Sequence, residues 1–253
     1  MVCRGSRLVA VALLVWGVAR PAQAALSEGP RLAAIYDSIL NAQFDRASTL
    51  LKAACPPAPS EACQVLAVVS MWWQIQINSA SRSRDQRFSE LAATAIKAAD
   101  AWTRREPQRA EAWFYLAGSY APLVQWEVLR GERLAAARNA SRIKRALERT
   151  LELDPTIVDA HFGIGLYEYY ADVASSAAKL LRWLLFLPGG DRVKGLRDML
   201  QARNGGELLR GEADFQLQQI DLWYEGRPRD ALALLESLDA RHACSVDGFE
   251  GGD

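Results

Sequence analysis

The strongest constraint on the fold is a helical pattern that recurs along the chain. In residues 113–120, apolar side chains follow the i, i+3, i+4 and i+7 spacing that places them on one face of a helix. They are Trp113, Leu116, Ala117 and Tyr120. The next helical segment ends at Pro155, and residues 159–170 (DAHFGIGLYEYY) then repeat the first pattern. One short hairpin cannot bury its own apolar face, so the repetition predicts that neighbouring helices stack on one another.

Prolines and glycines punctuate this pattern, and we expect them to fall between helices rather than inside them. Pro107 ends the helical segment before residue 110, as Pro155 ends the segment before residue 159. Strand-like alternation is scarce after residue 25. The sequence therefore predicts an all-α domain over residues 25–242 with about five antiparallel hairpins, near residues 30–57, 62–107, 110–155, 159–203 and 207–242.

The repeated unit resembles the tetratricopeptide repeat (TPR). That family has an aromatic, a large apolar and a small residue on its first helix, small residues on its second, and a closing proline. The residues that carry the resemblance are Trp113, Leu116, Ala117, Tyr120, Ile164, Gly165, Ala47, Ala231, Pro107 and Pro155. The interval from Trp113 to Pro155 is longer than a regular unit of about 34 residues allows, so the repeats are degenerate. The resemblance implies hairpins stacked as a right-handed α-solenoid, with small residues such as Ala117 and Gly165 at close helix contacts.

The resemblance also implies a binding groove, because the TPR family binds partners with fixed positions on the first helix of each unit. At those positions this sequence has Glu111, Phe114, Gly118, Ala121, Asp159, Phe162, Leu166 and Tyr169, with Tyr170 adjacent. Tyrosine and phenylalanine offer a large contact area with few rotamers to freeze. The alternative is that these aromatic side chains pack inside their own hairpins.

The N-terminus predicts export. Arg4 and Arg7 precede an apolar run over residues 8–19, and Ala22 and Ala24 form a small-x-small site. This is the pattern of a signal peptide over residues 1–24, cleaved after Ala24, although a buried N-terminal helix is the alternative. The protein is therefore expected to be exported, and in a bacterium it would be periplasmic or associated with the outer membrane.

Charge excludes one class of partner. The expected leader holds three of the 30 basic side chains and none of the 30 acidic ones, so the exported chain is slightly acidic. Binding nucleic acid usually requires a basic face, and we therefore expect no nucleic-acid partner.

Two cysteines bracket a proline-rich turn. Cys55 and Cys63 flank residues 56–62 (PPAPSEA), and an oxidising compartment would permit a disulfide between them. Two small buried thiols fit the spacing equally well, because sequence separation does not fix the Cα geometry.

An apolar segment over residues 180–187 is too short to span a membrane. It contains Trp183 and Phe186, which either pack between hairpins or form an apolar docking patch for a partner or a membrane surface. The turn at residues 188–190 must end this segment, and Asp191 is suited to cap the helix that follows.

Catalytic chemistry has little support in the sequence. The chain has two histidines, His161 and His242, and no nucleophile, metal-ligand or phosphate-loop motif. His161 stands where the repeat places a packed aromatic. We therefore expect a non-enzymatic exported scaffold that binds a protein or peptide in the cell envelope, without a cofactor or metal.

Two alternatives remain at the level of sequence. The first is a lipid- or glycan-handling envelope accessory protein that uses residues 180–187. The second is the regulatory part of a longer protein, since residues 243–253 form a glycine-rich tail, disordered or truncated, where a solenoid normally has a polar cap. The identity of the partner and the oligomeric state stay open.

Overall fold

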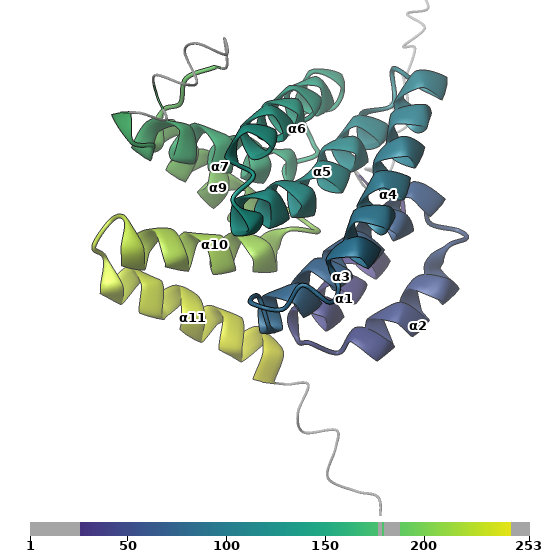
Figure 1. Cartoon of the computed structure of the whole chain (residues 1–253), viewed down its shortest axis with the longest axis horizontal. Helices are drawn as coiled ribbons and strands as arrows, with labels where there is room; N and C mark the ends of the chain where they lie inside the picture. The colour runs from purple at the N-terminus through teal and green to yellow at the C-terminus, as the bar shows by residue number, and fades with distance from the viewer. Residues whose placement is uncertain (1–25, 177–178, 180–187, 244–253) are drawn as a thin grey trace, which may run out of the picture.

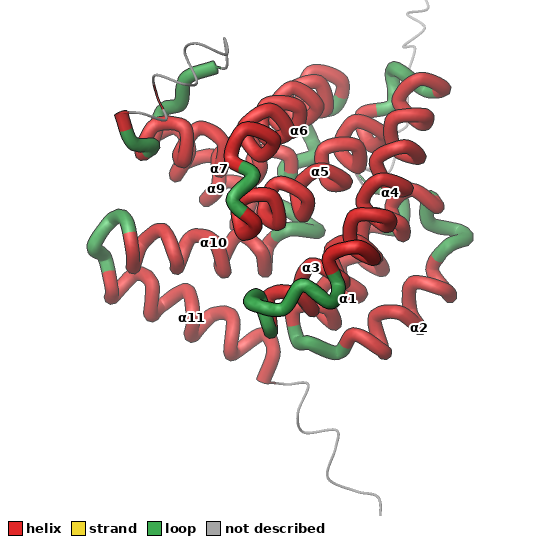
Figure 2. The backbone as a smooth tube through the Cα atoms, viewed as in Figure 1, coloured by secondary structure: helices red, strands yellow, loops and turns green. Residues whose placement is uncertain are grey.

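The computed structural model describes residues 26–176, 179 and 188–243. These residues form α-helices and no strand, which confirms the all-α class (Figure 2). The helices follow one another in pairs: α1 (Gly29–Leu40) and α2 (Phe44–Ala54), α3 (Ser60–Ile77) and α4 (Asp85–Arg105), α5 (Ala110–Arg130) and α6 (Arg133–Leu153), α7 (Ala160–Val173) and α9 (Arg192–Gly205), α10 (Arg210–Trp223) and α11 (Pro228–Ala243). The expected leader, Trp183, Phe186 and the tail after residue 243 lie outside the described residues.

Consecutive helices pack against each other along most of the chain (Figure 1). Helix α3 also packs against both α1 and α5, so first helices of neighbouring pairs touch directly. Short turns separate the helices other than α7 and α9, between which part of the chain lies outside the described residues. Gly131 ends α5 with a φ of 86°, a left-handed conformation that favours glycine. At the start of α9 the Asp191 carboxylate accepts a hydrogen bond of 2.9 Å from the Lys194 backbone N–H, so this side chain caps the helix as expected.

The expectation that prolines and glycines fall between helices is wrong at several positions. Gly118 lies within α5, Gly165 within α7 and Gly195 within α9. Pro122 lies inside α5 and is buried there. A proline within a helix costs a backbone hydrogen bond, but its ring contributes apolar surface to the core. Packing has outweighed the backbone preference at this position.

Small residues permit the close contact between α7 and α9. A Cβ atom built on Gly165 would lie 2.6 Å from the Gly195 carbonyl oxygen, and one built on Gly195 would lie 2.7 Å from the Gly165 oxygen. The backbones therefore meet where any side chain would collide.

The last pair of helices returns to the first. In Figure 1, α10 crosses the molecule toward α1 and α3. The Tyr36 hydroxyl of α1 donates a hydrogen bond of 3.0 Å to Glu212 of α10, and the Trp73 and Phe215 rings meet edge-on with centroids 5.0 Å apart. Burial raises the pKa of Glu212. Helix α10 is thus part of the interior of the fold.

A disulfide joins Cys55 at the end of α2 to Cys63 in the first turns of α3, with the two Cα atoms 6.5 Å apart. It closes the proline-rich turn and fixes the angle at which α3 leaves α2.

Replacing both cysteines, Cys55→Ala with Cys63→Ala, is expected to lower the free energy of unfolding by about 2.5 kcal/mol, because the bond restricts the unfolded chain. Urea denaturation followed by circular dichroism measures this change. A reductant should weaken the unmodified protein equally and leave the double variant unaffected. Coincident unfolding curves for the oxidised protein and the double variant would show that the bond contributes nothing.

Candidate functional site

The positions expected to form the TPR-type groove are mostly buried. Tyr170 is 36% exposed, and Gly118, Ala121 and Leu166 are partly buried. The remaining five side chains are no more than 6% exposed: Glu111, Phe114, Asp159, Phe162 and Tyr169. The groove implied by the resemblance is therefore not an open surface at these residues, and the alternative of internal packing describes the aromatic ones.

The N-terminal segment occupies the surroundings of Glu111. The Glu111 carboxylate accepts hydrogen bonds from the Ser27 backbone N–H at 2.8 Å and from the Ser27 hydroxyl at 2.9 Å. Arg109 completes the cluster with an ion pair of 2.7 Å to the same carboxylate. Leu26, next to Ser27, is 1% exposed. A partner would have to displace this segment to reach Glu111.

Asp159 holds the segment that leads into α10. Its carboxylate accepts three backbone N–H groups, from Glu207 at 2.8 Å, Leu208 at 3.0 Å and Leu209 at 2.7 Å. Burial and the nearby Asp159 charge raise the pKa of Glu207. Asp159 thus acts as an internal anchor for α10, which explains why the side chain is buried.

The aromatic positions of α7 pack against α9 and α10. Phe162 and Tyr169 share one apolar cluster with residues of both helices, including Met199 and Leu217. The Tyr169 hydroxyl donates a hydrogen bond of 2.5 Å to Glu225, and burial raises the pKa of Tyr169. Tyr169 is an internal residue.

Tyr170 differs from its neighbour because its ring reaches the surface. It meets the rings of Tyr169 and Tyr224 edge-on, with centroids 5.4 Å and 5.7 Å away. These centroid distances are those of ordinary aromatic contacts, so the three rings pack against one another.

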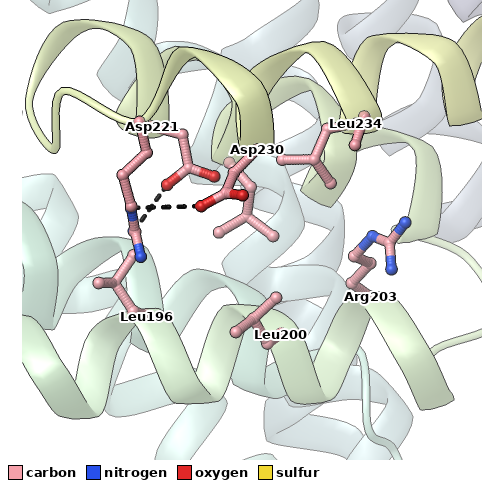
Figure 3. A pocket seen from close by; sticks show the side chains of 9 residues that line it. Leu196, Leu200, Arg203, Asp221, Asp230 and Leu234 are labelled. Carbon is pink, nitrogen blue, oxygen red and sulfur yellow. Dashed lines mark ion pairs between the residues drawn. The ribbon is translucent and has the colours of Figure 1, made fainter.

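An open cleft does occur elsewhere, between α9 and α11. Both helices pack on α10, and a hollow of about 340 Å³ remains above it (Figure 3). The lining consists of Leu196, Leu200, Arg203, Leu217, Asp221, Arg227, Asp230, Ala233 and Leu234. We call this hollow the C-terminal cleft.

Helix periodicity explains the lining of the C-terminal cleft. Leu196 and Leu200 lie one turn apart on α9, and Arg203 continues the same face. Leu217 and Asp221 are related in the same way on α10. Four leucines line the cleft, and Leu200 remains 45% exposed to solvent.

The charged side chains of the C-terminal cleft are already paired. Arg227 forms ion pairs with Asp221 at 2.6 Å and with Asp230 at 3.9 Å. Burial raises the pKa of Asp221. Arg203 pairs with Asp214. Figure 3 places Arg203 apart from the acidic pair, with Leu200 between them along the cleft.

A second hollow of about 270 Å³ adjoins the first, since Arg203 lines both. Its other lining residues are Asn204, Arg210, Asp214 and Ser237. The C-terminal cleft therefore continues into a polar surface along the same helices.

The described residues contain no cluster of three or more side chains suited to hold a metal ion. His161 is partly buried, and burial lowers its pKa. No helix within residues 26–176 and 188–243 combines the length and apolar character needed to cross a bilayer.

Sequence reasoning missed the C-terminal cleft, although a signal for it exists. The i, i+4 pair Leu196–Leu200 gives α9 an apolar face, and Ala233 and Leu234 give α11 apolar side chains on the side that lines the cleft. Which of these faces becomes buried depends on how the two helices sit on α10, and periodicity does not contain that information.

Comparison with known proteins finds no protein-family model and no curated protein that matches this chain.

Proposed function

We propose that this chain is a non-enzymatic exported scaffold that binds a protein or peptide partner in the cell envelope through the C-terminal cleft. The observation that carries the proposal is the open cleft between α9 and α11, in which Leu200 is exposed and Leu196 and Leu234 are half-buried. Its volume lies near the lower end of the range of about 300–1,000 Å³ typical of binding pockets. It suits a few side chains of a partner rather than a large cofactor.

The electrostatics of the C-terminal cleft favour an apolar ligand. Arg203 and Arg227 each have an acidic partner, so binding need not neutralise a free charge. The binding energy would come from burying leucine surface, at about 25 cal/mol per Å² of apolar area. The ion pairs at the rim would contribute orientation more than affinity.

The proposal includes a TPR-like right-handed solenoid as the scaffold. Three observations support the solenoid: the helices follow one another in pairs, α3 packs against both α1 and α5, and α7 and α9 meet at a close glycine contact. In this arrangement α10 and the segment at Ser27 fill the side that the TPR family uses for ligands. The partner would then bind between α9 and α11 instead.

A matched pair of variants tests the assignment. Leu200→Glu places a charge in the C-terminal cleft, whereas Leu134→Glu makes the same change on α6, and both leucines are 45% exposed. The measurement is recovery of partner on the tagged protein after cross-linking in cells that produce it naturally, followed by titration with the purified partner. We expect Leu200→Glu to weaken binding at least about tenfold and Leu134→Glu to leave it unchanged. Equal binding by both variants would contradict the cleft as the binding site.

A further inference from the structure

Helix α11 presents an apolar face with no neighbour in the described structure. Over residues 228–240, Ala231 is the one buried side chain, because α11 packs on α10 alone among the helices it contacts substantially. Leu232 and Leu235 are 56% and 43% exposed. They lie three residues apart and so share one face of the helix. This face is turned away from the C-terminal cleft, which α11 lines with Ala233 and Leu234.

One exposed charge, Asp239, lies on the leucine face itself, one turn beyond Leu235. The two charges on the flank of this face match the same charges on a second, antiparallel copy. Arg229 and Glu236 are seven residues apart, which places them two turns apart on the same flank of the two leucines. Both are exposed, and neither forms an ion pair within residues 26–243 as described. When a second copy of the helix runs in the opposite direction, the basic end of one flank lies beside the acidic end of the other.

We propose that α11 is a self-association surface, on which the α11 helices of two copies pair antiparallel about a two-fold axis. Leu232 of one copy packs against Leu235 of the second copy, and the two-fold axis repeats the contact. In that register Arg229 faces a position that is two residues along the helix from Glu236 of the second copy. The long arginine side chain spans this separation. A two-fold axis makes every contact twice, so two leucine contacts and two ion pairs form together.

The expected dimer is weak because the seam is short. Two leucines per copy bury much less than the area of about 1,200–2,000 Å² that is typical of stable specific complexes, so the pairing is a weak and transient one. The C-terminal cleft stays open in such a pair, so self-association does not depend on the proposed partner binding.

Sedimentation equilibrium of the full chain, from about 10 µM to about 1 mM, tests the pairing. We expect a reversible monomer–dimer equilibrium. Leu235→Glu should abolish it, whereas Leu134→Glu, which changes a leucine of similar exposure on α6, should leave it intact. A monomer at every concentration, or a dimer unaffected by Leu235→Glu, would overturn the proposal.

Charge swaps test the antiparallel register. Arg229→Glu and Glu236→Arg alone should each weaken dimerisation about tenfold, since each sets like charges opposite one another. The double variant, and an equimolar mixture of the two single variants, should both recover the affinity of the unmodified protein. Circular dichroism verifies that each variant is folded. If neither combination recovers dimerisation, the antiparallel pairing is wrong.

Discussion

Asp159→Ala is expected to lower the free energy of unfolding by about 4 kcal/mol, because one buried carboxylate holds three backbone N–H groups. Alanine would leave the N–H groups of residues 207–209 without their acceptor. Leu208 is itself buried, so water does not readily replace the lost bonds. The loss should also loosen α10, whose first turn follows this segment, and with it the floor of the C-terminal cleft.

Urea denaturation measures the effect, and a half-buried aspartate in a surface turn supplies the control. Asp154 accepts hydrogen bonds from the Thr156 backbone N–H at 2.9 Å and from the Thr156 hydroxyl at 2.6 Å in a surface turn. Asp154→Ala should therefore cost no more than about 1 kcal/mol. Asp159→Asn keeps one acceptor oxygen and should fall between the two. Equal losses at residues 154 and 159 would refute the anchoring role of Asp159.

Gly195→Ala is expected to destabilise the fold by about 3 kcal/mol, despite the higher helix propensity of alanine. The added methyl group would lie 2.7 Å from the Gly165 carbonyl oxygen and 2.7 Å from the Tyr169 backbone nitrogen. Both neighbours are backbone atoms of α7, so relief requires the two helices to move apart. That movement would open the apolar cluster around Tyr169 and Met199.

Gly189→Ala is the matched control for this substitution. Gly189 has no heavy atom within 4 Å of the built Cβ position, and its φ is not left-handed. We expect the Gly189→Ala variant and the unmodified protein to have the same unfolding midpoint in urea, within experimental error. If Gly195→Ala behaves like Gly189→Ala, the close backbone contact between α7 and α9 does not hold the fold together.

Local features of this fold could be predicted from the sequence. Helix type follows from apolar periodicity, the ends before residues 110 and 159 follow from Pro107 and Pro155, and the cap at Asp191 follows from its place after a glycine turn. Small residues such as Gly165 marked a close helix contact. Each of these features depends on neighbours within a few turns.

The outcome at the expected groove could not be predicted in the same way. Glu111 binds Ser27 across 84 residues, and Asp159 binds residues 207–209 across about 50 residues. Contacts over such sequence separations leave no periodic pattern in the sequence. An acidic side chain that holds the fold together therefore cannot be told apart, by sequence, from one that binds a partner. Pro122 shows the same limit, since packing overrode its usual place at a helix end.

The central claim is that a partner binds in the C-terminal cleft and not at the groove positions of the TPR family. Site-specific photo-cross-linking in cells that produce the protein naturally tests it most directly. One photoreactive residue replaces Leu200 in the cleft, and another replaces Tyr170, the groove position that is 36% exposed. We expect a discrete cross-linked partner from position 200 and none from position 170. A partner captured from position 170 alone would contradict the claim.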